Sequence, residues 1–112
     1  MSINIVISDT VGFKVEGAIN DAAGTPQPFD FSLVCKRLDS DTIDEQMKGD
    51  FTPAKVRDFF TAHTTGWSRV RDASGQEAPF STDALAALLK IPGLTSLAFR
   101  KYIAEVGSKE KN

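Results

Sequence analysis

Hydrophobic and polar residues alternate along the first third of the chain, a spacing typical of half-buried β-strands. Residues 20–26 interrupt the alternation with a dense group of turn-forming residues. We therefore expect an antiparallel hairpin over residues 12–38 with one apolar face, in which Gly17 marks a bulge or a weak point. The alternating apolar positions are Ile3, Ile5, Ile7, Phe13, Val15, Ile19, Phe29, Phe31, Leu33 and Cys35.

The spacing becomes helical after Asp39. Residues 39–42 offer several N-caps, and Thr42 with Glu45 fits a capping box. Ile43 and Met47 lie four residues apart, on one helical face. The pattern predicts a short helix in this region.

A second helix is expected over residues 53–64. Gly49 ends the first helix, Thr52 caps the next one, and Pro53 suits the first helical position because its missing N–H bonds nothing there. Gly66 is expected to stop this helix. The residues that share its inner face are Val56, Phe59, Phe60 and His63.

The remainder of the chain predicts a turn and two more helices. The segments 67–70 and 77–80 flank a turn at 72–75, as a small hairpin or an irregular connection. Ser81 or Thr82 caps a helix whose apolar stripe is Leu85, Leu88 and Leu89. Residues 91–93 break it, and a last helix runs from Leu94 to Val106 and ends at Gly107.

Strands followed by helices indicate an α+β fold, here an N-terminal antiparallel β-hairpin or sheet and about four short α-helices. We expect a single domain over residues 1–107 and a polar, disordered tail over residues 108–112. A chain of 112 residues holds one domain and hardly more.

Composition excludes several classes of protein. The net charge is −2 and the basic residues are scattered, which argues against nucleic-acid binding. No apolar run approaches the ~20 residues of a membrane helix, and the N-terminus lacks the pattern of a signal peptide. With one cysteine, no internal disulfide forms. We therefore expect a cytoplasmic protein that does not contact membranes.

The sequence shows no pattern that requires a catalytic or metal site. His63 is the only histidine and is interpreted as a partly buried or helix-capping residue, while Cys35 is interpreted as a buried thiol. The acidic cluster Asp39, Asp41, Asp44 and Glu45 lacks the spacing of a calcium loop. We expect no enzyme activity, cofactor or metal; the alternative is a small enzyme that uses His63 with this cluster.

Two features exceed what a small core requires. More than half the circumference of the last predicted helix is apolar, so it is either sandwiched inside the fold or meets a partner. Trp67 is either a packing anchor or an interface hot spot. The apolar positions of the helix are Leu94, Leu97, Ala98, Phe99, Tyr102, Ile103 and Val106.

The segment from Gly66 to Tyr102 resembles one protein family. It carries a Gly-Trp-Ser-Arg-Val string at residues 66–70, an acidic glycine turn, an Ala-Pro-Phe-Ser helix start at residues 78–81, and a leucine-rich helix. This order resembles the tail assembly chaperones of long-tailed, siphophage-like bacteriophages and prophages. The sequence departs from the family pattern at Arg69, where a small residue such as glycine is expected.

The resemblance implies a chaperone that binds the tape-measure protein, keeps it soluble and recruits tail tube subunits. It also implies a location in the host bacterial cytoplasm, absence from the mature virion, and the option of self-association. The alternative is a structural tail component, such as a tube or tail-completion protein. The residues expected at the partner surface are Trp67, Phe80, Leu94, Leu97, Phe99, Tyr102, Ile103 and Val106.

Overall fold

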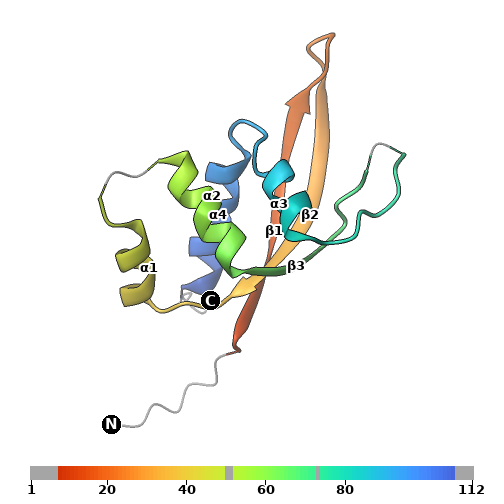
Figure 1. Ribbon diagram of the computed structural model, residues 1–112. Helices are drawn as coiled ribbons and strands as arrows, with labels where there is room; N and C mark the ends of the chain where they lie inside the picture. Colours follow the sequence, from red (N-terminus) through yellow and green to blue (C-terminus); the bar gives the residue numbers. More distant parts are fainter. Residues whose placement is uncertain (1–7, 50–51, 73, 108–112) are drawn as a thin grey trace, which may run out of the picture.

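A three-stranded antiparallel sheet, in the order β1-β2-β3, and four helices make up an α+β fold (Figure 1). This computed structural model describes residues 8–49, 52–72 and 74–107. The predicted strand positions Ile3, Ile5 and Ile7 lie outside the described residues, as does the predicted tail at 108–112. The α+β class expected from the sequence is confirmed.

The predicted hairpin is present as β1 (Thr10–Asn20) and β2 (Pro26–Lys36). The two strands pair without interruption from Thr10 opposite Lys36 to Asn20 opposite Pro26. The ladder passes through Gly17 in regular register, so no bulge forms there. At the turn, the carboxylate of Asp21 accepts hydrogen bonds from the backbone N–H groups of Ala23 and Thr25, at 2.9 and 3.0 Å.

A third strand, β3 (Thr64–Ser68), follows directly after the second helix and corrects one prediction. Gly66 does not stop that helix; it lies inside β3, opposite Val34 of β2. A five-residue segment is too short for its pattern of apolar residues to predict a strand. β3 forms because it pairs with β2, which lies far away in the sequence. Beyond β3 the connection is irregular, with one isolated bridge between Arg71 and Glu77.

The four helices are α1 (Ser40–Met47), α2 (Pro53–His63), α3 (Thr82–Leu88) and α4 (Leu94–Val106). Asp39, Thr52 and Ser81 cap the first three by accepting a backbone N–H bond. The predicted capping box of Thr42 and Glu45 is wrong, because α1 begins earlier and Asp39 accepts from the N–H of Thr42 at 2.8 Å.

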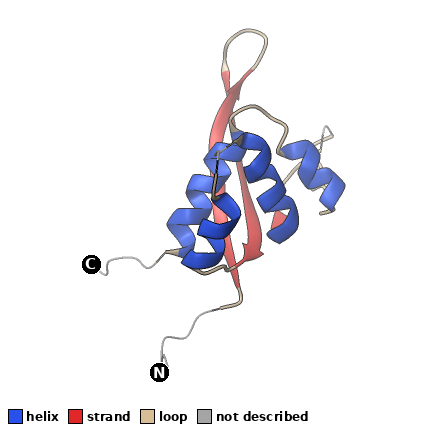
Figure 2. Ribbon diagram, turned by 60° about the vertical axis from the view of Figure 1, so that its left-hand side comes forward, coloured by secondary structure: helices blue, strands red, loops and turns tan. Residues whose placement is uncertain are grey.

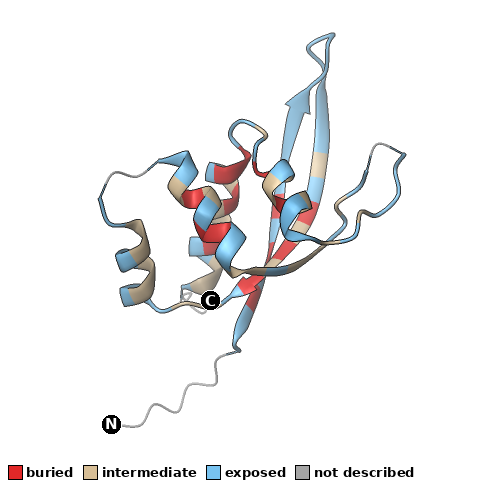
Figure 3. Cartoon of the chain, in the orientation of Figure 1, coloured by how far each residue is buried: buried red, intermediate tan, exposed pale blue. Residues whose placement is uncertain are grey.

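All four helices gather on one face of the sheet, as Figure 2 shows. The core lies between the two layers (Figure 3), since the apolar alternation of β1 and β2 faces α2, α3 and α4. On the other face of the sheet, Gly12, Lys14 and Glu16 of β1 are exposed. The buried apolar residues are Val11, Phe13, Val15, Phe31, Leu33, Cys35, Val56, Phe59, Phe60, Leu85, Leu89, Leu94, Ala98 and Tyr102.

The outer half of the hairpin, residues 16–30, is called the arm here; its base lies beside α4 and its tip projects beyond the helices (Figures 1 and 3). Most of its residues are exposed, including Ile19, whose exposed fraction is 45%. β3 pairs with β2 only between Ser32 and Cys35, so none of the described strands adds a third strand to the arm. Two prolines, Pro26 and Pro28, lie in this part of β2.

Candidate functional site

The residues expected at a partner surface do not form one patch. Tyr102 is fully buried and Leu94 is 4% exposed, so both belong to the core and are not free to bind a partner in this conformation. Leu97, Phe99 and Val106 are half-buried, whereas Ile103 is exposed. The apolar helix α4 is therefore mostly sandwiched inside the fold, because β1 and α2 both pack against it.

The buried end of α4 is fastened to the end of β2. The hydroxyl of Tyr102 donates to the carbonyl of Lys36 at 3.0 Å and accepts from the N–H of Leu38 at 3.3 Å. The guanidinium of Arg37 donates to the carbonyl of Val106 at 3.1 Å. These bonds show that Tyr102 is a structural residue in this chain.

Trp67 and Phe80 form a structural joint. Their rings contact edge to face with centroids 5.2 Å apart, and both side chains are half-buried. The indole N–H of Trp67 donates to the carbonyl of Ala78 at 2.9 Å, which ties β3 to the segment before α3. The packing-anchor interpretation of Trp67 therefore accounts for its contacts.

Asp72 organises the loop between Trp67 and Phe80. Its carboxylate accepts from the hydroxyl and N–H of Ser74 and from the N–H of Gln76, at 2.7 to 3.0 Å. These bonds, led by the Ser74 hydroxyl, lower the pKa of Asp72. Gly75 lies in the left-handed region, with φ +82°, as the turn requires.

An apolar hollow lies between the arm and the α3–α4 corner. Two adjoining cavities of about 340 and 320 Å³ share Ile19, Phe29, Ile91 and Leu94 as lining residues. We call them together the arm groove. Its other apolar lining residues are Pro28, Phe31, Val70, Leu88, Ala18, Pro92 and Leu97.

Gly17 fixes the inner end of the groove. A Cβ atom at this position would lie 2.9 Å from Cζ of Phe29 and 3.3 Å from Cδ2 of Leu97. A side chain at this position would require the side chain of Phe29 or Leu97 to shift. The Phe29 ring also stacks on Phe31, with centroids 6.0 Å apart, so two packed aromatic rings line this side of the groove.

Arginine residues line part of the rim. Arg69 has φ +64°, the only positive φ of a non-glycine residue in the described chain. Its N–H donates to Glu77 at 3.0 Å, and its guanidinium pairs at 2.8 Å with Asp30, which also lines the groove. Arg71 and the exposed Arg100 also line the groove. A binding partner would therefore meet an apolar floor with charged edges.

The backbone at Arg69 bears on the family resemblance. The family pattern has a small residue at this position, and a left-handed φ favours glycine. Arg69 adopts that backbone at a cost of about 1 kcal/mol.

His63 and Cys35 lie in structural surroundings. Nε2 of His63 contacts Oε1 of Gln46 at 2.8 Å, and its ring packs edge to face on Phe59. Cys35 is fully buried, and its Sγ lies 3.3 Å from the Thr64 hydroxyl. Burial raises the pKa of the Cys35 thiol to about 11, although the bond to Thr64 opposes the rise. This thiol is not an activated nucleophile at neutral pH.

The acidic cluster and His63 do not share a cavity beside α1. Asp39 lines the larger cavity there and His63 lines neither of the two. Within the described ranges, no group of three or more His, Cys, Asp or Glu residues has the arrangement of a metal site. In the same residues, no helix is long and apolar enough to cross a membrane.

Comparisons of the chain with protein-family models, with curated proteins and with solved structures gave no match. Functional inference therefore depends on the arm groove and the resemblance of residues 66–102. Sequence reasoning placed Ile19 and Phe29 on an apolar strand face and Ile91 in a helix break, but it did not bring them together. Their proximity depends on where the α3–α4 corner packs, which no local pattern encodes.

Proposed function

We propose that this chain is a tail assembly chaperone of a long-tailed phage or prophage, and that its arm groove binds apolar helical segments of the tape-measure protein. The observation that carries the proposal is the groove itself. An apolar helix binds a groove through residues spaced three and four apart. The floor between Ile19 and Leu97 offers apolar contacts of this kind, at the base of an arm whose tip projects beyond the helices.

The charged rim supports the same function. Arg69 and Arg71 lie on one side of the groove and Arg100 lies at its far end, while Asp30 and Glu16 supply negative charge. Rim charges contribute more to orientation and selectivity than to affinity. A chaperone that covers many similar helices benefits from an apolar floor, which tolerates sequence variation better than hydrogen-bonded contacts do.

Co-expression with an apolar helical fragment of a tape-measure protein tests the proposal. We expect the chain to increase the soluble fraction of the fragment and to co-elute with it on a sizing column. Ile19→Asp should abolish both effects, because it places a charge on the groove floor. If the unchanged chain neither solubilises nor binds the fragment, the proposal is wrong.

Ile103→Asp is the matched control. Ile103 is 40% exposed, close to the 45% of Ile19, but it lines neither cavity of the groove. We expect this variant to keep full activity. The reverse result, with Ile103→Asp inactive and Ile19→Asp active, would move the binding surface to the outer face of α4. Circular dichroism confirms that both variants are folded.

The arm favours a second candidate function, as a structural tail component. Among the described strands, β1 is an edge of the sheet, so the arm is able to pair with a neighbouring subunit along β1. Mass spectrometry of purified particles separates the two functions. Stoichiometric presence in the particle supports the structural component, and absence supports the chaperone.

A further inference from the structure

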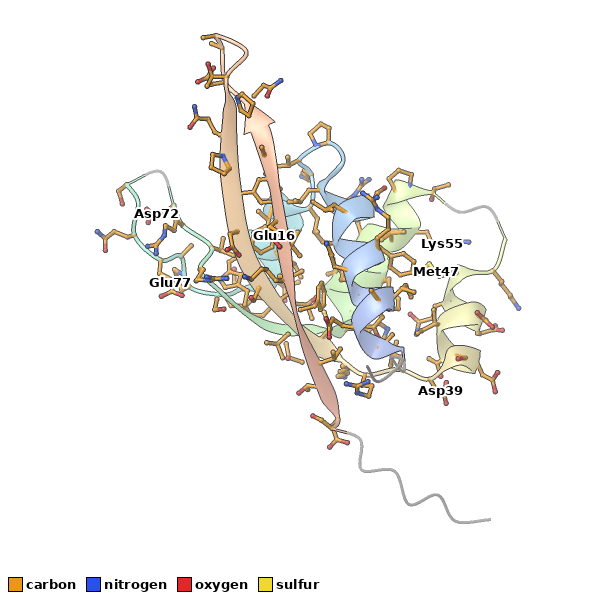
Figure 4. All side chains as sticks on the ribbon, turned by 180° about the vertical axis from the view of Figure 1, so that it is seen from behind. Glu16, Asp39, Met47, Lys55, Asp72 and Glu77 are labelled. Atoms are coloured by element: carbon orange, nitrogen blue, oxygen red, sulfur yellow. The ribbon has the colours of Figure 1, made fainter. Side chains whose placement is uncertain are left out.

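The edge of β1 is regular along the whole strand. In the sheet order β1-β2-β3, β1 pairs only with β2, and none of the described strands lies on its other side. The strand keeps one unbroken register from Thr10 to Asn20 and holds no proline. An edge of this kind offers its backbone groups to a further strand. Figure 4 shows the molecule from the side of β1, with Glu16 on that strand.

The hydrogen bonds to β2 determine which residues of β1 face the open edge. The N–H of Arg37 donates to the carbonyl of Asp9 at 2.9 Å, and these two residues continue the register of the ladder by one pair. Because bonded and non-bonded pairs alternate in an antiparallel ladder, the odd-numbered residues of β1 bond to β2. The even-numbered residues direct their N–H and C=O groups to the open edge. In the middle of the strand these are Gly12, Lys14, Glu16 and Ala18.

Glu16 has no counter-ion among the described residues. It lies directly opposite Asp30 of β2, so two carboxylates face each other across the ladder. The cations beside this pair bind Asp30 instead, Arg69 at 2.8 Å and Lys14 at 3.9 Å. Like charges directly opposite each other destabilise a sheet, so a cation placed beside Glu16 on the open edge would offset the repulsion. The side chain of Lys14 is 51% exposed and stays within reach of that edge.

We propose that β1 pairs with β1 of a second copy of this chain, antiparallel and centred on Val15, to make a closed dimer with one continuous sheet. The two-fold axis then sets Lys14 opposite Glu16 of the second copy, and Glu16 opposite Lys14. Both pairs join residues that face the open edge, so the hydrogen bonds of the two strands are in phase. The neighbouring centres that keep this phase are excluded by charge, because one sets two copies of Lys14 opposite each other and the other sets two copies of Glu16 opposite each other.

The same register gives an exposed apolar side chain a neighbour. Residues that lie opposite each other in a ladder are on the same face of the sheet. Ile19, exposed at 45%, therefore lies beside Val11 of the second copy, on the face that carries the helices. Ile19 also lines the arm groove, whereas Lys14 lines neither of its cavities. The dimer does not depend on the function proposed for the groove, and the charged pair tests it separately.

Charge reversal tests the pairing and its register. Analytical ultracentrifugation measures the dissociation constant of the unchanged chain and of the variants Lys14→Glu and Glu16→Lys. Each variant sets like charges opposite each other in both cross-strand pairs, so we expect its dissociation constant to rise about tenfold. Lys90→Glu is the control, since it makes the same change in net charge as Lys14→Glu at an exposed position outside the sheet. This control should dimerise as the unchanged chain does, and circular dichroism confirms that every variant is folded.

The two single variants should rescue each other. When Lys14→Glu and Glu16→Lys chains are mixed, every cross-strand charge pair joins a glutamate to a lysine, so a mixed dimer should form as tightly as the unchanged one. The double variant with both changes in one chain should dimerise as well, because it only exchanges the two charges. An unchanged chain that is monomeric at about 1 mM, where even weak pairing is visible, would overturn the proposal. Single variants that dimerise like the unchanged chain, or a mixture that stays monomeric, would overturn it too.

Hydrogen exchange of the unchanged chain locates the interface without any variant. The N–H groups of Lys14 and Glu16 face the open edge, so they should exchange at least about tenfold more slowly in a concentrated sample than in a dilute one. The N–H of Val15 bonds to β2 in both samples and should change much less. If the exchange of Lys14 and Glu16 is the same at both concentrations, any dimer forms through another surface and the inference is wrong.

Discussion

Replacing Tyr102 with phenylalanine removes one oxygen atom and tests whether this residue serves the fold or a partner. The hydroxyl makes two hydrogen bonds, to the carbonyl of Lys36 and from the N–H of Leu38, and the side chain is fully buried. Each bond contributes about 1 kcal/mol net. We therefore expect Tyr102→Phe to lower the free energy of unfolding by about 2 kcal/mol.

Urea and thermal unfolding measure this loss. With an unfolding entropy of roughly 2 cal/mol/K per residue, a chain of this length should lose about 9 °C in Tm. Ile103→Ala, one position further along α4, is the control; its exposed side chain should change stability by less than about 0.5 kcal/mol. If Tyr102→Phe is as stable as the unchanged chain but no longer binds a tape-measure fragment, the structural role argued for Tyr102 is wrong.

Three further changes test other parts of the fold. In urea unfolding, the Gly17→Ala variant should be about 1 kcal/mol less stable than the Gly12→Ala variant. A Cβ at Gly17 would lie 2.9 Å from Phe29, whereas one at Gly12 would meet nothing closer than 3.9 Å. Equal stabilities of the two variants would contradict this close approach. Cys35 should not react with a disulfide reagent at about pH 8 until urea unfolds the chain, because its pKa is about 11; fast labelling of the folded protein would disprove this. Burial, and to a smaller extent the charge of Lys36, lowers the pKa of His63 from its ordinary value of 6.5. The stability that neutral His63 contributes is therefore complete above pH 6.5. It is lost as the pH falls through the lower pKa of the folded state. Urea unfolding at several pH values should show this acid-side loss, and His63→Asn should reduce it; a loss that is unchanged in the variant would assign it to other groups.

Most elements of the fold follow from local patterns in the sequence. The bounds of α4 agree with the prediction from Leu94 to Val106, and Thr52 caps α2 as expected. The alternation of β1 and β2 predicts the hairpin and its buried face. These elements are predictable because the period of apolar residues and the caps act over a few neighbouring positions.

The parts that could not be predicted depend on contacts between distant segments. β3 is held by its pairing with β2, and Gly66 therefore continues a strand where a local rule expects a helix stop. Arg69 adopts a backbone that favours glycine, while its side chain pairs with Asp30, 39 residues away. The arm groove likewise joins β1, β2 and the α3–α4 corner. Local periodicity identified its apolar residues but did not indicate that they face one another.

The prolines of the arm have a consequence for behaviour at high concentration. Pro26 and Pro28 pair with β1 through an unbroken ladder, and a proline fits a paired strand only where its nitrogen points away from the partner. The outer side of β2 in the arm thus lacks two N–H donors, so a foreign strand that adds there finds gaps in its hydrogen bonding. A protein whose projecting arm discourages indiscriminate strand addition is suited to work beside aggregation-prone chains without joining their aggregates.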